Sequence, residues 1–286
     1  MISWYFFALL ALLLMGIQRF FYKVAAEKKY PTEWVTFSFM ATVTLLSTGV
    51  YFFQQHHELN IIWLMTMSLI NSASFLVATV SHIEALKYIP ANIAYSIIRL
   101  NVVVVAGFSI FYFKEQISLF QGIGLLVAVA AMIVLTIQMR ENTKKTKQGR
   151  RGAVFILLAL LCGATASISS KFAAMHVDKL AFIALSYLMG MIGSLGITRA
   201  LSYDKAKKKR SAAMGLGVVM GGFNFAGFYA FLYALECGPL SLVAAIVGMH
   251  FVIAIVLSAI IYRENIKPAG LVGIFLTVIS IILIRI

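Results

Sequence analysis

The sequence predicts an all-α membrane protein with ten transmembrane helices, built as two inverted five-helix repeats. Three observations predict this fold: 62% of the residues are hydrophobic and only 12% are charged, the chain divides into long apolar runs, and it contains an internal repeat. Soluble domains carry about 25% charged residues. Most of this chain's surface is therefore expected to contact lipid rather than water.

A membrane-spanning helix needs about 20 mostly apolar residues, because each residue adds about 1.5 Å along the helix axis. Ten runs of this length are predicted as spans: residues 2–22, 32–53, 60–82, 91–113, 117–138, 152–172, 179–199, 212–235, 240–262 and 266–285. A membrane barrel uses strands of about ten alternating residues, so these longer runs favour helices. The first run lacks the features of a secretory signal and is expected to be a span.

Basic residues gather in alternate connections, which predicts the orientation in the membrane. Six Lys or Arg lie in 140–151 and six in 199–210, both of which follow odd-numbered spans. The even-numbered connections and the C-terminus hold four, namely Lys114, Lys171, Lys179 and Arg285. Because basic loops stay in the cytoplasm, a multi-pass protein of the cytoplasmic membrane with both termini outside is predicted. The net charge of +14 is expected to face lipid headgroups, and nucleic acid is not an expected partner.

An internal repeat relates the two halves of the sequence. A shift of 149 residues aligns residues 84–124 with 233–273 without a gap. The matched pairs include Ala85 with Ala234, Leu86 with Leu235, Pro90 with Pro239 and Glu115 with Glu264. A shift of 148 residues likewise places Lys23 on Lys171. Matched Pro and Glu at equal spacing are harder to attribute to chance than matched apolar residues.

The repeat sets the expected domain boundaries. A first five-helix repeat is predicted at residues 1–138, a basic cytoplasmic linker at 139–151 and a second five-helix repeat at 152–286. Since five crossings are an odd number, the two repeats must have opposite orientations in the membrane. Inverted repeats of this kind recur in secondary transporters, whose substrate site lies near the bilayer midplane between the repeats.

The pairing of Ala85-Leu86 with Glu115, and of Ala234-Leu235 with Glu264, resembles the drug/metabolite transporter (DMT) superfamily in its EamA-like ten-helix branch. The resemblance covers essentially the whole chain and implies two five-helix repeats. In that family an Ala-Leu motif ends the third helix of each repeat, and a Glu follows the fourth. The chain departs from the family pattern at a frequent Pro, here Val102 and Phe251, and at the Gly before the Glu, here Lys114 and Arg263.

A central substrate site is predicted from the polar residues of the fourth and ninth spans. Asn101 lies roughly 16 Å along the helix from Pro90, at about the bilayer midplane. Its repeat counterpart is His250. Both are expected to hydrogen-bond a substrate, and the alternative is that they only join helices. Arg99 in the same span is costly in lipid, which predicts that it faces a cavity or a partner.

Further substrate-binding residues are predicted on other spans. Asn71 and Ser74 share one helical face of the third span, Asn224 lies in the eighth span, and the ring of Tyr95 is a candidate for shaping the pocket. The alternative for these residues is ordinary packing. Glu115 and Glu264 lie between spans and are interpreted as turn or helix-start anions.

These features predict a secondary active transporter, with export of small metabolites or drugs by alternating access as the expected activity. The alternatives are a sugar or nutrient uptake permease of the same fold and a membrane-embedded enzyme. Sequence motifs of hydrolases and nucleotide-binding proteins are absent, so we expect no enzymatic activity, no cofactor and no metal site. A small-molecule substrate and the bilayer are the expected partners of a monomer or homodimer. His250 is the hypothesised carrier of a coupling proton.

Overall fold

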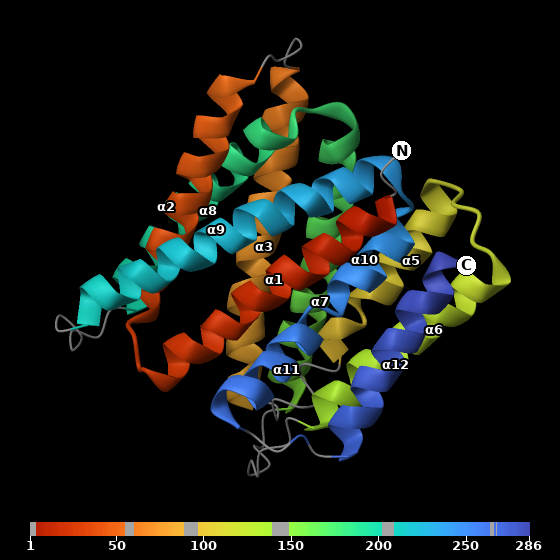
Figure 1. Ribbon diagram of the computed structural model, residues 1–286. Coiled ribbons are helices and arrows are strands. Elements are labelled where there is room, and N and C mark those ends of the chain that lie inside the picture. The colour runs from red at the N-terminus through yellow and green to blue at the C-terminus, as the bar shows by residue number, and fades with distance from the viewer. Residues whose placement is uncertain are drawn as a thin grey trace.

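The computed structural model describes residues 4–54, 60–88, 97–138, 149–201, 209–263, 266 and 268–286. Within these ranges the regular elements are all α-helices, as predicted (Figure 1). Their bounds are α1 Trp4–Glu27, α2 Thr32–Phe53, α3 Ile61–Tyr88, α5 Asn101–Tyr112, α6 Leu119–Gln138, α7 Gly149–His176, α8 Lys179–Leu201, α9 Arg210–Cys237, α10 Leu240–Gly248, α11 Phe251–Tyr262 and α12 Pro268–Arg285.

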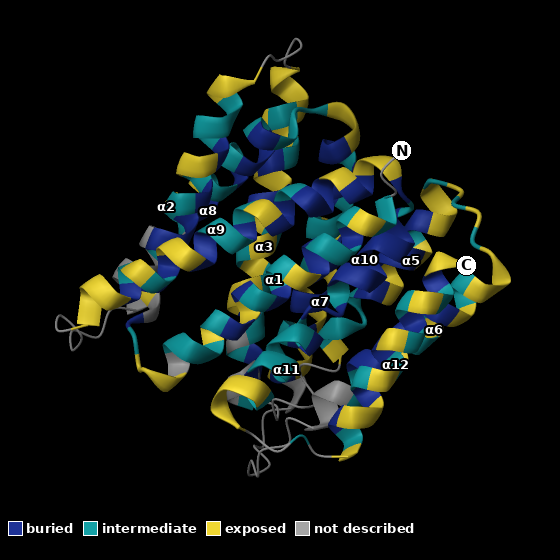
Figure 2. Cartoon of the chain, viewed as in Figure 1, coloured by how far each residue is buried: buried dark blue, intermediate teal, exposed yellow. Residues whose placement is uncertain are grey.

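Seven helical segments of the described chain are long and apolar enough to cross a membrane. Three shorter apolar helical segments, at residues 97–112, 119–134 and 179–193, occupy the positions of the remaining predicted spans. Large apolar side chains are exposed on the outside of the bundle, among them Phe53 at 92% and Phe111 at 89%. Along the helices, exposed residues alternate with buried ones (Figure 2). The protein is therefore a multi-pass membrane protein, and the count of ten crossings stays a prediction.

The helices before residue 138 pack mainly against helices that come after residue 149. α1 packs on α9, while α7 packs on α3; α2 packs on α8, and α6 packs on α12. In the sequence repeat α1 corresponds to α7, α2 to α8, α3 to α9 and α6 to α12. Each of these contacts therefore has a counterpart in which the two halves exchange roles. The two halves share one core, and α10 lies deep within it, with eight of its nine residues buried (Figure 2).

Close helix packing between α2 and α9 depends on glycine. A Cβ atom at Gly217 would lie 1.9 Å from Ser38 Oγ and 2.5 Å from the carbonyl oxygen of Val35. One turn later, a Cβ atom at Gly221 would lie 2.6 Å from Thr42 Cβ. Small residues four apart let two membrane helices approach to backbone contact. This is the packing role that a G-x-x-x-G pair predicts.

One face of the bundle carries the described helix ends that adjoin the even-numbered connections, together with the start of α1 and the end of α12; we call it face E. Tyr5, near the start of α1, donates a hydrogen bond to the carbonyl oxygen of Ile281 in α12 at 2.9 Å. The ring of Trp63, near the start of α3, stacks on His176 at the end of α7, with ring centroids 4.9 Å apart. Helix ends that are distant in sequence thus lie together on one face, as expected when successive helices cross the membrane in opposite directions.

The opposite face, face O, carries the described helix ends that adjoin the odd-numbered connections. Lys209, just before α9, donates to the carbonyl oxygen of Lys28 after α1 at 2.7 Å. Tyr88 at the end of α3 stacks on Phe155 near the start of α7, with ring centroids 6.1 Å apart. The helices therefore run alternately between two faces. Which face meets the cytoplasm stays a prediction from the basic connections.

Candidate functional site

Two helix breaks lie at equivalent positions of the sequence repeat. In the second half, α10 ends at Gly248 and α11 begins at Phe251. In the first half, Leu100 separates a helical turn at 97–99 from α5. Across both breaks the backbone makes tighter three-residue bonds, such as His250 N to Val247 O at 3.0 Å and Val103 N to Leu100 O at 2.9 Å. Such turns within a membrane helix often mark hinges and substrate sites.

Residues 240–262 are long and apolar enough to cross a membrane, as predicted, and the second break interrupts the helix within them; the first break lies in the described part, 97–113, of the span predicted at 91–113. Gly248 is a weak signal for the second break. Around Leu100 the sequence has neither Gly nor Pro. Beside this break α5 and α7 approach closely, because Asn101 Nδ2 lies only 3.1 Å from where a Cβ atom at Gly163 of α7 would stand. At the matching place in the second half, the carbonyl oxygen of His250 lies 2.5 Å from a Cβ atom built at Gly16 of α1.

The two breaks touch each other. Arg99 Nη1 donates to the carbonyl oxygen of Gly248, the last residue of α10, at 3.4 Å. The Arg99 guanidinium also lies 4.6 Å from the ring centroid of Phe251, the first residue of α11. Val102 packs against Gly248 from the other side. Arg99 therefore lies against the second break, contacting it on either side of His250, while Asn101 at the first break lies against Gly163 of α7; their binding of a substrate stays a prediction.

His250 is buried, with its ring held in one orientation. Its Nδ1 lies 2.7 Å from the carbonyl oxygen of Val247. Because a carbonyl oxygen only accepts, Nδ1 carries the proton of that bond. Nε2 of the neutral ring is then an acceptor, and it is buried with no hydrogen-bond partner among the described residues. Buried polar atoms without a partner are uncommon in folded proteins and call for an explanation.

Arg19 of α1 lies near the second break, although it was not among the predicted site residues. One turn before it, a Cβ atom at Gly16 would lie 2.5 Å from the carbonyl oxygen of His250. Arg19 is exposed, with its guanidinium 5.4 Å from the ring centroid of Tyr22. An arginine inside an apolar helix was the available signal, because such a charge is costly in lipid. Two arginines, Arg19 and Arg99, therefore lie near the second break.

Asn71 and Asn224 form bonds between helices. Asn71 Nδ2 on α3 donates to the carbonyl oxygen of Ala166 on α7 at 2.9 Å and lies within 3.1 Å of two serine hydroxyls there. Asn224 Nδ2 on α9 contacts Gln18 Oε1 on α1 at 3.4 Å, and Asn224 Oδ1 accepts from Tyr187 at 2.5 Å. Gln18 is the repeat counterpart of Ala166, so the two asparagines join equivalent helix pairs.

The remaining predicted site residues add less. Ser74 is half-buried on α3, one turn from Asn71. Tyr95 lies outside the described residues. Binding of a substrate by Asn71, Ser74, Asn224 or Tyr95 stays a prediction. Among the described residues, no group of three or more His, Cys, Asp or Glu side chains could hold a metal ion.

On face E, the turn between α9 and α10 is held from the first half of the chain. Glu115 Oε1, after α5, accepts a hydrogen bond from Leu240 N at 2.6 Å. Its Oε2 accepts from the backbone N and the hydroxyl of Ser241, at 3.2 and 2.6 Å. An anion at the start of a helix is stabilised by the exposed N–H groups and the helix dipole. Glu115 is therefore a helix-start anion, as predicted, but the helix belongs to the other half.

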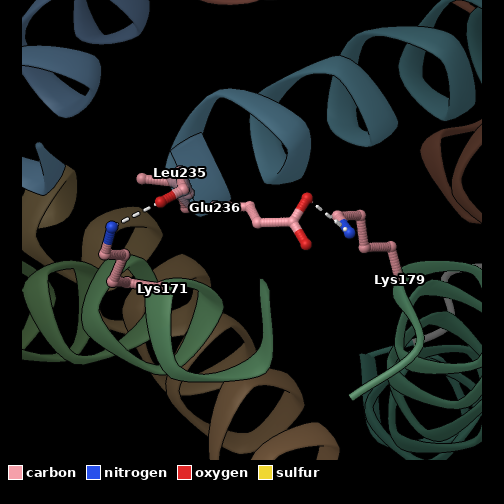
Figure 3. Close-up of polar contacts among 4 residues, drawn as sticks. All are labelled: Lys171, Lys179, Leu235 and Glu236. Atoms are coloured by element: carbon pink, nitrogen blue, oxygen red, sulfur yellow. Dashed lines mark hydrogen bonds and ion pairs between the residues drawn. The ribbon is translucent and has the colours of Figure 1, made fainter. Parts of the chain in front are cut away.

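Two lysines hold the other side of this turn (Figure 3). Lys171 of α7, only 7% exposed, donates to the carbonyl oxygens of Leu235 and Gly238 at 2.5 and 2.9 Å. Lys179 pairs with Glu236 at 2.8 Å. A cation is favourable at the C-terminus of a helix and an anion at the N-terminus, so the lysines stabilise the end of α9 as Glu115 stabilises the start of α10. We call the cluster of Glu115, Lys171, Leu235, Gly238 and Ser241 the turn clamp.

Comparisons with known proteins agree with this architecture. Residues 2–137 and residues 150–286 each match the model of a family described as the EamA-like transporter family. A solved structure titled "Crystal structure of protein" matches with a TM-score of 0.78 and 15% sequence identity, over 99% of this chain and 98% of that chain. That likeness shows a shared fold. No curated protein matches the sequence of this chain.

Proposed function

The chain belongs to the EamA-like transporter family, and from this premise we propose that it is a secondary active transporter that exports small metabolites or drugs across the cytoplasmic membrane. In this proposal, two inverted repeats at residues 1–138 and 152–286, joined by the linker 139–151, carry out alternating access. The protein acts without a cofactor and is not an enzyme. It functions in the bilayer as a monomer or homodimer.

The contact between the two helix breaks is the observation that carries the proposal. Each break replaces regular helical bonds by a tighter turn, at which the flanking segments can change angle. The breaks occupy equivalent repeat positions and touch through Arg99 and Gly248. If the repeats are inverted, a change at one break that opens one face has a counterpart at the other break that opens the opposite face.

Solute counterflow in proteoliposomes tests this function. Purified protein is reconstituted, loaded with one unlabelled solute, and assayed for accumulation of the same labelled solute against empty liposomes. We expect saturable counterflow for at least one solute, with the reverse reaction also measurable, because a carrier exchanges substrate in both directions. Flux that rises linearly with concentration and never saturates would indicate a channel instead. Export is tested by comparing inside-out with right-side-out vesicles.

Movement at the second break can be tested with one methyl group. A Cβ atom at Gly248 would lie 2.8 Å from Met132 Cε and 3.2 Å from Val102 Cγ2. We expect Gly248→Ala to slow counterflow by roughly tenfold while substrate affinity changes little, since only the moving contact is crowded. Gly107→Ala on α5 is the control, because nothing lies within 4 Å of a Cβ atom there. Equal rates for the two variants would contradict a hinge at this break.

The proposed coupling ion is a proton carried by His250. Of the side chains, imidazole is the one whose unperturbed pKa lies closest to neutral pH, which makes His250 the candidate carrier. His250→Asn keeps a hydrogen-bonding group near the position of Nδ1 and removes the titratable ring. We expect this variant to retain counterflow and to lose uphill transport driven by a pH gradient. Undiminished gradient-driven transport by the variant would exclude His250 as the carrier.

A further inference from the structure

We propose that the start of α9 and the turn between α1 and α2 form a binding site on face O for the phosphate of an anionic phospholipid. Its cations are Lys209 and Arg210 from the second half of the chain, with Lys28 and Lys29 from the first. All four residues are exposed. The site is independent of the transported solute and of the proposed transport function, because it lies on the surface of the bundle rather than at its centre.

A direct contact brings the cations of the two halves together. Lys209 Nζ donates to the carbonyl oxygen of Lys28 at 2.7 Å, which places its charge at the turn that carries Lys28 and Lys29. Arg210 follows Lys209 in the sequence and begins α9, which packs along α2. Figure 1 shows the start of α9 next to the connection from α1 to α2. The four charges therefore share one area of face O.

Two aromatic rings hold these cations and mark the depth of the site. The guanidinium carbon of Arg210 lies 3.5 Å from the ring centroid of Trp34, and Lys209 Nζ lies 6.0 Å from that of Tyr30. Both rings pack, partly buried, against the core of the bundle. Trp and Tyr concentrate at the level of the lipid headgroups in membrane proteins. The rings therefore place the two cations beside the phosphates of the surrounding lipid.

Donor groups remain at this site for a ligand. Lys209 uses one of its three N–H groups on Lys28, and Arg210 donates no side-chain hydrogen bond within the described part of the chain. A guanidinium stacked on a ring keeps its N–H groups at the edge of its plane, where they suit phosphate oxygens. Glu27 and Glu33 are exposed nearby, and neither forms an ion pair with another described residue.

The charge of the surrounding sequence selects among lipids. Residues 199–210 hold six Lys or Arg and a single acid, Asp204. Clusters of basic residues beside a membrane helix attract anionic lipid, with a gain in affinity of roughly fivefold per residue. The phosphate of a zwitterionic lipid carries its own amine as a counter-charge, whereas phosphatidylglycerol has a net negative charge. The complementary ligand is therefore an anionic phospholipid of the bilayer itself.

Lipid titration of the purified, delipidated protein tests the site. Phosphatidylglycerol and phosphatidylcholine with the same acyl chains are added in detergent, and bound lipids are counted by native mass spectrometry. We expect phosphatidylglycerol to bind roughly tenfold or more tightly than phosphatidylcholine, with a smaller preference in high salt. Equal affinities for the two lipids would overturn the proposal. Inorganic phosphate and glycerol 3-phosphate should not displace the lipid, and displacement would show a site for free anions instead.

Variants assign the binding to these residues. Arg210→Gln and Lys209→Gln should each weaken phosphatidylglycerol binding roughly fivefold and leave phosphatidylcholine binding unchanged. Both residues are exposed, so both variants are expected to fold. Arg151→Gln is the matched control, because it removes one exposed charge from face O at the start of α7. It should bind phosphatidylglycerol normally.

Two outcomes of the variant series contradict the site. An equal loss of phosphatidylglycerol binding in Arg151→Gln and Arg210→Gln would show general attraction to a basic surface. Unchanged binding by both Arg210→Gln and Lys209→Gln would show that the lipid binds elsewhere. A parallel loss of phosphatidylcholine binding in Arg210→Gln would show a structural defect, and Lys209→Gln then decides the assignment, since its ring contact is the looser of the two.

Discussion

The turn clamp on face E and the centre where the two helix breaks meet are both polar regions inside an apolar bundle, yet they differ in how their polar groups are satisfied. In the clamp, Glu115 accepts three hydrogen bonds and Lys171 donates two, all to the turn between α9 and α10. In the centre, His250 Nε2 is buried without a partner among the described residues. Saturated groups stabilise a structure, whereas an open acceptor is suited to a ligand.

The largest expected effect is loss of stability in the clamp. Lys171→Met leaves the carbonyl oxygens of Leu235 and Gly238 without their donor, and we expect the free energy of unfolding to fall by about 3 kcal/mol. Thermal unfolding in detergent measures the change. Lys179→Met is the control, since its pair with Glu236 is partly exposed and is worth about 1 kcal/mol or less. Equal losses from the two variants would mean that the clamp is an ordinary surface cluster.

Removing the anion of the clamp should cost less. Glu115→Ala takes away the acceptor at the start of α10, and loss of such a cap costs about 1–2 kcal/mol. Glu115→Gln should recover part of the stability, because its amide oxygen still accepts a hydrogen bond. The same thermal assay ranks the three proteins. If Glu115→Gln unfolds at the temperature of Glu115→Ala, charge rather than hydrogen bonding dominates the cap.

The same measurement at the centre should give a smaller change. His250→Asn retains a donor for the carbonyl oxygen of Val247 and removes an acceptor that has no partner in the described part of the chain. Stability should therefore change by less than about 1 kcal/mol. A loss as large as that of Lys171→Met would show that His250 is a packing residue, and the contrast between clamp and centre would fail.

The smallest expected effect is a gain. Lys114 and Arg263, at equivalent repeat positions, adopt the left-handed conformation with φ of 51° and 54°. These are the positions at which the family usually has Gly, and a non-glycine residue is strained there. Lys114→Gly next to the clamp should raise stability by up to about 1 kcal/mol, measured by thermal unfolding. Lys179→Gly, at the first residue of α8, removes the ion pair with Glu236 and should lower stability instead.

Membrane-crossing helices could be predicted from the sequence because a helix in lipid needs a long apolar run, whichever helices it packs against. Sequence reasoning reached Asn101 and His250 because the repeat places them at one depth. It missed the breaks beside them, since the sequence around Leu100 holds neither Gly nor Pro to signal one. Lys171 shows the same limit: it was counted among the basic residues of the connections, but α7 buries it against the end of α9.

The exchange of packing partners between the halves has a consequence for biosynthesis. α1, α2 and α3 leave the ribosome long before α7, α8 and α9, yet these later helices are their principal partners. Before α9 is made, the surface of α2 that packs against Gly217 has no partner. Before α7 is made, Asn71 has no Ala166 carbonyl oxygen to which it can donate. The first half must therefore wait in the membrane incompletely assembled. Co-expressed as separate polypeptides, the two halves are expected to find each other through these same surfaces.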